Sequence, residues 1–363
     1  MANITSLIKQ MQEEGGFVEL ARNPLAQFGV RARRYIGAEI LPERNVDHYA
    51  FRETGIRYRS VIASPRSRYS PPVLKKGSLV GEFDVILGDS GLAAEMDAQE
   101  YDTLIRLLAR QDDMQAMLTL LNWVETVLNR PQLEHNERER WQALVDASVV
   151  RNGANGFTET ISYPNPSGHR FNAGGTWSSD AYDPWADITA AAKVLADKGF
   201  TVSRIIAGRD VISKLAGNDK IKARTGPLVV SASGQIQGIN GQATRAAINN
   251  ALNAEGLPPI EEYNLQYRTQ TGTGYFLSRS AMVLISETEQ DELIDLGDSE
   301  KVLRNTLGYT AVGPVASYPE PGRQIKVRVK DDEVIQRVEG EAAQTSLPVL
   351  REPEAVAVIK QIA

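Results

Sequence analysis

The sequence predicts a mixed α+β protein in which a long helix separates an extended β-hairpin from a compact α/β region. Its 363 residues suggest two or three domains of ~100–200 residues each. Apolar residues recur every three or four positions over 97–130, but every second position over 79–87. From residue 183 to residue 286, helical and strand patterns alternate, which is typical of an α/β domain.

The composition excludes several kinds of chemistry. The chain has no cysteine, which rules out disulfide frameworks, cysteine nucleophiles, iron–sulfur clusters and thiolate zinc sites. Its three histidines, His48, His135 and His169, include no pair four residues apart, so we expect neither a zinc enzyme nor a cofactor. No stretch approaches the ~18 apolar residues of a membrane helix, and residues 1–12 lack the features of a secretory signal. We therefore expect a soluble, intracellular protein without membrane contact.

The charge is divided unevenly along the chain. Residues 1–80 carry 13 basic and 7 acidic side chains, whereas the rest carries 27 basic and 39 acidic ones. The net charge of −6 argues against nucleic-acid binding through bulk electrostatics. The division instead suggests that the basic front of one subunit binds an acidic surface of another.

Thirteen charged residues are the candidates for such a subunit interface. Nine are basic and lie in the first 80 residues, and four lie in the acidic run 287–300, which has seven carboxylates and no basic residue. They are Arg31, Arg33, Arg34, Arg57, Arg59, Arg66, Arg68, Lys75, Lys76, Asp291, Glu292, Asp295 and Asp298. A nucleic-acid arm is the alternative for the basic segment. A calcium loop is disfavoured for the acidic run, because leucine and isoleucine residues interrupt the ligand spacing.

A long β-hairpin is predicted before residue 90. Strand-like alternation covers 55–63 and 79–87, and the prolines and glycine of 64–77 indicate the turn. The apolar residues of this hairpin are too few for a core of its own, and an isolated hairpin is marginal in water. We expect a neighbouring surface to cover it.

The strongest helical signal begins at Asp97, a possible N-cap with Glu100 three positions later, and ends at Pro131. About 33 residues at ~1.5 Å each give a strut of ~50 Å. Met114 and Met117 stand at helical spacing and are predicted to fill a core. A second, shorter helix is predicted over 136–150.

The region from residue 183 is predicted to be a compact α/β domain. Its predicted helices cover 185–198, 210–216 and 242–255, and its predicted strands cover 201–207, 263–267, 274–277 and 282–286. The glycines between 216 and 241 form no phosphate-binding motif, so we interpret them as a loop rather than a nucleotide site.

Three stretches of the sequence resemble a known family. They are GTWSSDAYDPWADI at 175–188, the strand and helix pattern of 202–215, and 307–316 together with 346–350 and 353–359. With the order of arm, hairpin, strut helix, α/β domain and returning strands, they make the chain similar to tailed-bacteriophage major capsid proteins of the HK97-like fold, specifically the major capsid protein E family. The similarity covers nearly the whole chain in order.

The resemblance implies five parts. They are an N-terminal arm at 1–45, an extended β-hairpin loop at 46–90, a peripheral domain with a spine helix at 91–176, an axial α/β domain at 177–306, and a return to the peripheral domain with the C-terminal segment at 307–363.

The resemblance also implies a function. The expected protein is a structural major capsid protein, not an enzyme, that self-assembles as hexamers and pentamers into an icosahedral shell around double-stranded DNA. Its implied partners are a scaffolding function, a portal, a decoration protein and the packaged DNA, with assembly in the host cytoplasm and a final place in the virion. Some relatives form lysine to asparagine crosslinks, and Lys75 and Lys76 lie near the hairpin turn without matching such a motif.

Three other functions remain open at this point. An encapsulin-like cargo compartment would use the same fold. A carboxylate-dependent hydrolase would use the α/β domain, although no two of the 46 acidic residues stand out as a catalytic pair. A monomeric binding module would neither assemble nor catalyse.

Overall fold

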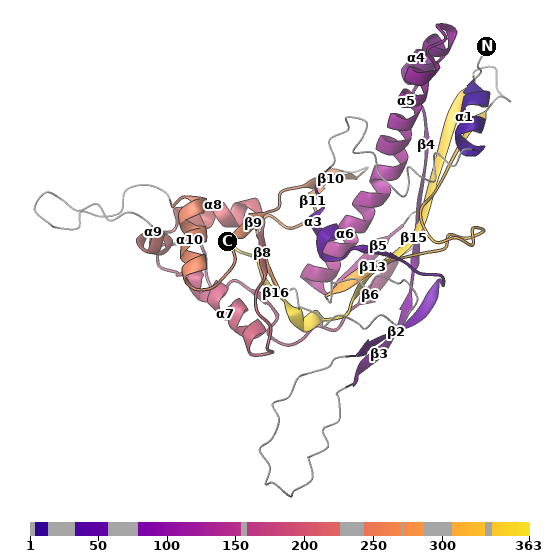
Figure 1. Cartoon of the computed structure of the whole chain (residues 1–363). Helices are drawn as coiled ribbons and strands as arrows, with labels where there is room; N and C mark the ends of the chain where they lie inside the picture. Colours follow the sequence, from indigo (N-terminus) through magenta and orange to yellow (C-terminus); the bar gives the residue numbers. More distant parts are fainter. Residues whose placement is uncertain are drawn as a thin grey trace, which may run out of the picture.

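The computed structural model describes residues 4–13, 33–56, 79–153, 158–225, 243–269, 272–286, 307–330 and 336–363. Helices and sheets both contribute to its framework, which confirms the predicted α+β class. Figure 1 shows a long column of helices beside an elongated sheet, a compact region of shorter helices to one side, and a two-stranded ribbon that points away from both.

Most helices belong to the column or to the compact region (Figure 1). In chain order they are α1 (Ile4–Glu13), α3 (Ile36–Ile40), α4 (Ala98–Ala109), α5 (Asp113–Trp123), the π-helix η1 (Val124–Asn129), α6 (Arg130–Asp146), α7 (Pro184–Ala196), α8 (Arg209–Gly217), α9 (Asp219–Thr225), α10 (Arg245–Ala254) and the 3₁₀-helix η3 (Pro353–Ala355).

The strands form two five-stranded sheets and three ribbons. The spine sheet contains β1 (Glu43–Asn45), β13 (Gly308–Gly313), β15 (Arg337–Leu350), β14 (Gln324–Lys330) and β4 (Gly88–Glu95). The second sheet has the order β7 (Arg170–Asn172), β16 (Val356–Lys360), β12 (Met282–Ile285), β8 (Arg204–Ala207) and β9 (Ile260–Glu262). The ribbons pair β2 (Ala50–Ile56) with β3 (Leu79–Ile86), β5 (Ser148–Asn152) with β6 (Thr158–Ser162), and β10 (Gln266–Thr269) with β11 (Gly272–Tyr275).

Strand β15 organises the spine sheet because it pairs with three other strands. Both β14 and β4 pair with residues 339–343, so they lie on opposite edges of β15. Beyond β14, strand β13 pairs with residues 345–350. One face of this sheet, including Val327 and Val338, packs against apolar residues of the helix column such as Leu120. Helix α1 adds Ile4 and Met11 to the same core.

Both faces of the second sheet are covered. Met282 and Leu284 of β12 lie in a core with α7, α8, α9 and α10, whereas Val283 and Ile285 lie in a core with α3 and α6. Successive side chains of a strand point to opposite faces, so an uninterrupted apolar run is what a doubly covered strand requires. The C-terminal strand β16 has the same pattern and pairs with β12. The end of the chain therefore lies in the second sheet.

The predicted strut helix is interrupted once. Helix α4 begins directly after Asp97, as predicted, although the Asp97 side chain makes no capping hydrogen bond. The helix then stops at Arg110, and Gln111 adopts a left-handed conformation with φ of 62°. The side chain of Asp112 accepts a hydrogen bond from the N–H of Gln115 and starts α5.

The predicted end of the strut at Pro131 is wrong. Proline usually ends a helix because it lacks an N–H group and its ring collides with the carbonyl four residues earlier. Here η1 precedes it, and the N–H of Arg130 bonds to the carbonyl of Glu125, five residues back. The wider turn replaces the bonding pattern that proline would break, and α6 continues to Asp146. Residues 148–150 of the predicted second helix form β5 instead.

Other predictions hold in part. Strand β3 confirms the predicted strand at 79–87, whereas the turn at 64–77 and most of 55–63 lie outside the described residues. Met117 packs against the column core as expected. Met114 is 71% exposed, so its predicted core role is wrong: it lies in the first turn of α5, and the buried side chains of that helix begin at Ala116. Within the described ranges, no helix is long and apolar enough to cross a membrane.

Candidate functional site

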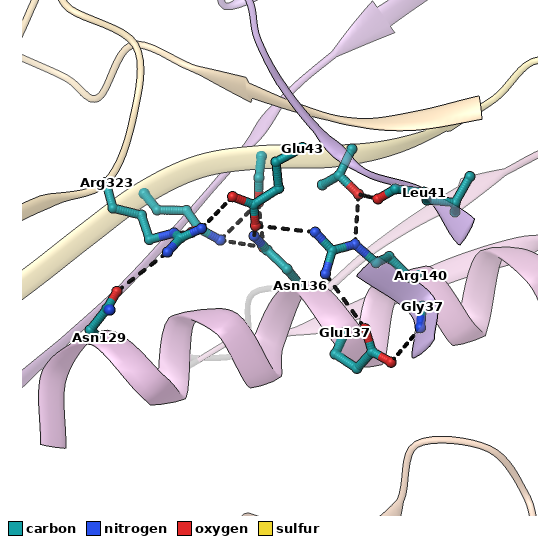
Figure 2. Close-up of polar contacts among 11 residues, drawn as sticks. Gly37, Leu41, Glu43, Asn129, Asn136, Glu137, Arg140 and Arg323 are labelled. Atoms are coloured by element: carbon teal, nitrogen blue, oxygen red, sulfur yellow. Dashed lines mark hydrogen bonds and ion pairs between the residues drawn. The ribbon is translucent and has the colours of Figure 1, made fainter. Parts of the chain in front are cut away.

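Helix α6 is polar along most of its length and is nevertheless enclosed by other elements. Its buried polar side chains are Gln132, Asn136, Glu137, Glu139 and Arg140, and none is more than 3% exposed. Burying a charged group is costly unless it is paired and hydrogen-bonded. The partners of these side chains therefore define a network, the α6 network, and Figure 2 shows its centre, where α6 meets the N-terminal segment, residues 33–45, and the spine sheet.

Arg140 and Glu43 form the centre of this network (Figure 2). The Nε of Arg140 donates to the hydroxyl of Thr310 on β13 at 2.8 Å, and its Nη2 donates to Glu43 on β1 at 3.1 Å. Glu43 also accepts from Asn136 at 3.1 Å and pairs with Arg323. Burial alone would raise the pKa of Glu43, but Arg323 and Arg140 hold it below its usual value. Glu43 is therefore an anion held between two cations.

The other side of Asn136 faces strand β15. Its carbonyl oxygen accepts a hydrogen bond from the hydroxyl of Ser346 at 2.9 Å and another from the amide of Gln344. The Gln344 amide also donates to Ser346 at 3.0 Å. These three residues are buried, and together they fix α6 against the middle of the longest strand.

Glu137 connects α6 to α3 and to the segment after β9. One of its carboxylate oxygens accepts hydrogen bonds from the backbone N–H of Gly37 at 2.8 Å, from the indole of Trp141 at 2.8 Å, and from the hydroxyl of Tyr263 at 2.7 Å. A Cβ on Gly37 would lie 2.7 Å from this carboxylate, so the close approach requires glycine. Burial and the Glu137 carboxylate raise the pKa of Tyr263, which keeps its hydroxyl a donor.

Glu139 connects α6 to strand β5. Its two oxygens accept from the Nε and Nη2 of Arg151 at 2.6 and 2.8 Å. Burial opposes ionisation, but hydrogen bonds from Arg151 and His135 lower the pKa of Glu139 to about 2. Arg151 also donates to the carbonyl of Ser346 at 2.7 Å. A Cβ on Gly88 would overlap the guanidinium of Arg151, so the close approach of β4 to Arg151 requires glycine at this position.

The network is suited to holding parts together rather than to chemistry. It joins the N-terminal segment, α6, the spine sheet and β5 through charges that have partners. The described part of the chain contains no group of three or more histidine, cysteine or carboxylate residues placed to hold a metal ion. A rigid building block with a fixed relation between its parts is what this arrangement provides.

Two of the thirteen predicted interface residues lie in the described part of the chain, and both bind partners within it. Arg33 donates to Glu134 at 2.7 Å. Arg34 pairs with Glu39 and with Glu261, both at 2.6 Å. Arg204 pairs with the same two glutamates at 3.2 and 2.7 Å, which links the N-terminal segment to the second sheet.

The other predicted interface residues lie outside the described residues. These are Arg31, Arg57, Arg59, Arg66, Arg68, Lys75, Lys76, Asp291, Glu292, Asp295 and Asp298. Their role in subunit contacts stays a prediction.

The aromatic and acidic motif at 175–188 has a structural role. Asp187 accepts from the indole of Trp177 at 2.7 Å and from the hydroxyl of Tyr182 at 2.6 Å. Asp183 caps α7 by accepting from the N–H of Trp185 at 3.1 Å. The amide of Asn218 donates to the carbonyl of Trp177 at 3.0 Å. The motif therefore folds the segment before α7 into a fixed loop.

The α6 network is absent from the sequence-based candidates. A helix that is polar on all sides can be solvated or enclosed by polar partners, and its periodicity does not distinguish these cases. The available signal is that residues 130–140 lack an apolar stripe although they continue a helix with an apolar one. The partners themselves are distant in sequence, as Glu43 and Arg323 are.

Comparison with known proteins gives a consistent result. The family model of phage major capsid protein E matches residues 101–360. No curated protein matches the chain. Among solved structures, a protein described as a prophage capsid protein from Escherichia coli CFT073 aligns with a TM-score of 0.59 at 15% identity, covering 96% of this chain and 98% of that chain. A phage-related protein from Bordetella bronchiseptica RB50 aligns with a TM-score of 0.51 at 16% identity, covering 95% and 96%.

An encapsulin complex from Synechococcus elongatus PCC 7942 is more distant. It aligns with a TM-score of 0.39 at 8% identity, covering 94% of each chain. A similarity this low carries no argument for a cargo compartment. The two stronger alignments show that this chain shares the fold of the Escherichia coli and Bordetella bronchiseptica proteins.

Proposed function

Because the chain belongs to the phage major capsid protein E family, we propose that it forms the hexamers and pentamers of an icosahedral shell around the double-stranded DNA of a tailed phage. Family membership and the HK97-like fold establish that the protein is a structural major capsid protein that assembles into the shell of a virion, and that it is not an enzyme.

The β2–β3 ribbon is the observation that carries the proposal. It leaves the body of the subunit (Figure 1). Val85 and Leu87 at its base pack in a core with the spine sheet. Isolated two-stranded ribbons are marginal in water, so a surface outside the subunit must stabilise this one. In a shell the neighbouring subunit supplies that surface, and extended contacts enlarge the interface toward the size of a stable one.

The buried α6 network supports the same proposal from inside the subunit. Closed symmetric shells need repeated contacts at fixed angles, so each subunit must hold its parts in one arrangement. The network joins the N-terminal segment to the spine sheet through Glu43 and Arg140, and to the segment after β9 through Glu137. Polar contacts of this kind require one geometry, whereas apolar contacts tolerate several.

We assign the five parts of the subunit as an arm at 1–45, an extended loop at 46–90, a peripheral domain at 91–176, an axial domain at 177–306 and a return at 307–363. The pairing of β16 with β12 extends this assignment, because it adds the C-terminal strand to the axial sheet. One chain thus crosses between the two sheets more than once, which supports a subunit that moves as a unit.

Contacts between subunits are proposed to combine the basic front with the acidic run 287–300. Charge complementarity favours this pairing and would steer subunits toward each other at low salt. Arg33 and Arg34 already bind glutamates of their own chain, so the remaining basic residues are the ones proposed to reach a neighbour. A scaffolding function, a portal, a decoration protein and non-specific contact with packaged DNA complete the proposed partners, with assembly in the host cytoplasm.

The direct test is electron microscopy of the expressed chain, alone and with its scaffold. Closed shells or capsomers are expected, and a strictly monomeric protein under every assembly condition would contradict the proposal. Nuclease-protected DNA in particles from infected cells separates a phage shell from an encapsulin-like compartment, which would enclose protein and no genome.

A further inference from the structure

The β2–β3 ribbon is attached to the body at a small, well-defined base. Val85 and Leu87 are 3% and 1% exposed, and they pack with Ala311, Leu347 and Val349 of the spine sheet. The backbone N–H of Leu87 donates to the carbonyl of Tyr49 at 3.0 Å and closes the ribbon at this end. The direction of the described part of the ribbon depends on how this base is held.

Glu53 is buried at the base of the ribbon although it is a carboxylate. It is 7% exposed, and its two oxygens have different partners. The hydroxyl of Tyr309 donates to Oε2 at 2.7 Å, and the Nε of Arg351 donates to Oε1 at 2.5 Å. A buried carboxylate with a charged and a neutral donor is held in one position, because leaving either oxygen unpaired is costly.

Two arginines also stack on the ring of Tyr309. The guanidinium carbon of Arg351 lies 5.0 Å from the ring centroid, and that of Arg44 lies 5.3 Å from it. Both distances are within the ~6 Å range of cation–π attraction. Burial, and next the hydrogen bond to Glu53, raise the pKa of Tyr309, so its hydroxyl stays protonated and continues to donate.

These four residues come from four places in the fold. Arg44 lies in β1, Glu53 in β2, Tyr309 in β13, and Arg351 directly after β15. The register between β2 and β3 shifts between Thr54 and Ile56, immediately after Glu53. Such irregularities bend a ribbon and increase its twist. The four-residue cluster therefore holds the ribbon directly before its register shifts.

We propose that Arg44, Glu53, Tyr309 and Arg351, the ribbon clamp, set the direction in which the β2–β3 ribbon leaves the subunit and thereby the curvature of the assembled shell. Glu53 is a positioning residue in this proposal, because it acts through the ribbon that reaches the neighbour. The inference rests on the proposed function, since only an assembled shell has a curvature.

The lever formed by the ribbon explains why a small base can matter. Strand β3 has eight residues and is ~26 Å long at ~3.3 Å per residue. The clamp residue Glu53 pairs with Phe83, ~13 Å from the far end of β3 at Leu79, so a rotation of about 10° at the clamp moves that end by about 2 Å. A displacement of that size is larger than the tolerance of a well-packed interface, so the neighbour must change its angle.

The test compares Glu53→Gln and Tyr309→Phe with wild type and with a control, Glu339→Gln. Glu339 also pairs with an arginine, Arg328, at 3.1 Å, but lies near the start of β15, whereas Arg351 of the clamp follows the end of that strand. Hydrogen exchange of residues 50–53 and 84–87 is measured on the full-length subunit, and particle diameters are measured by electron microscopy. Thermal unfolding of each variant monitors whether the subunit remains folded.

We expect Glu53→Gln to accelerate exchange at the base of the ribbon by about tenfold or more, because it weakens hydrogen bonds to a charged group. Tyr309→Phe should act in the same direction with a smaller effect, since the ring and both arginines remain. Both variants should shift or broaden the distribution of particle diameters, and Glu339→Gln should change neither quantity.

Unchanged exchange or unchanged diameters in both clamp variants would overturn the inference, as would an equal change in the control. A variant that fails to fold would leave the decision to the other one, because Tyr309→Phe removes a single hydroxyl. If the wild-type chain forms no particles at all, the proposed function fails, and unchanged exchange would still reject the clamp separately.

Discussion

Helices α5 and α6 belong to one column and are buried by opposite chemistry. The side chains that α5 buries are Ala116, Leu120, Leu121 and Trp123, which pack in the apolar core of the column. The side chains that α6 buries are mostly charged or amide groups with specific partners on β1, β13 and β15. An apolar core contributes stability and tolerates repacking. The polar half of the column, α6, instead requires one arrangement of its partners. We therefore infer that the apolar half, α5, stabilises the subunit and that α6 determines its geometry.

The largest expected effect is on the polar half. Arg140→Met fills a similar volume but leaves Glu43 with one cation fewer and removes the donor to Thr310. Breaking one partner of a buried ion pair costs about 3–5 kcal/mol, and urea unfolding of the subunit measures it. Arg328→Met is the control, because Arg328 is 52% exposed and its pairs are expected to contribute less than about 1 kcal/mol. Equal losses in both variants would remove the distinction.

A smaller loss is expected in the apolar half. Leu120 of α5 is fully buried against α4 and the spine sheet. Leu120→Ala therefore leaves a cavity and lowers the free energy of unfolding by about 3 kcal/mol. Met114→Ala should change the free energy of unfolding by less than about 0.5 kcal/mol, because Met114 is 71% exposed. We further expect Leu120→Ala to lower stability without altering the shape of any particles formed. Particles of altered diameter would contradict the separate roles of the two helices.

A single methyl group tests the contact between α6 and the N-terminal segment. In Gly37→Ala the new Cβ would lie 2.7 Å from the Glu137 carboxylate, which must move and weaken its bond to Tyr263. The expected cost is about 1–3 kcal/mol, read from the midpoint of chemical unfolding. Gly217→Ala has open space around the added Cβ and should be neutral or slightly stabilising. A neutral Gly37→Ala would show that the contact is not close.

The smallest effect concerns pH. His169 is fully buried, its Nδ1 lies 3.0 Å from the carbonyl of Val356, and its Nε2 has no hydrogen-bond partner among the described residues. Burial lowers the pKa of His169. The hydrogen bond to the Val356 carbonyl and the charge of Glu354 oppose this shift, and the charges of Lys198 and Arg170 add to it. The unfolded chain therefore binds a proton that the folded chain does not, and stability should fall as the pH drops below ~6.5.

The slope from this one histidine is at most about 1.4 kcal/mol per pH unit. Unfolding measured from pH 7.5 to 5 in wild type and His169→Gln isolates it, because glutamine does not titrate. Identical slopes in the two proteins would exclude His169 as the cause.

Local signals in the sequence account for much of the fold. The apolar runs of β12 and β16 indicate strands covered on both faces, and Asp97 marks the start of α4. Strand β14 is absent from the predicted elements although Ile325, Val327 and Val329 alternate with basic residues in it. Its alternation is short and charged, and its partner β15 becomes evident only with the tertiary structure.

The candidate site could not be predicted in the same way. Arg140 has partners at Glu43 and Thr310, and Glu53 has partners at Tyr309 and Arg351. Such pairs lie far apart in the chain and follow no spacing rule. Pro131 shows a second limit of local rules, because the π-helix before it removes the reason for the helix to end there.

Electron microscopy of wild type beside Arg140→Met, at the same protein concentration and in the same buffer, tests the central claim most directly. A phage capsid subunit whose geometry depends on the α6 network should give closed shells of uniform diameter in wild type. The variant should give open sheets, irregular particles or free subunits under conditions where it remains folded. A wild-type chain that stays monomeric in every assembly condition, or a folded variant with shells identical to wild type, would contradict the account.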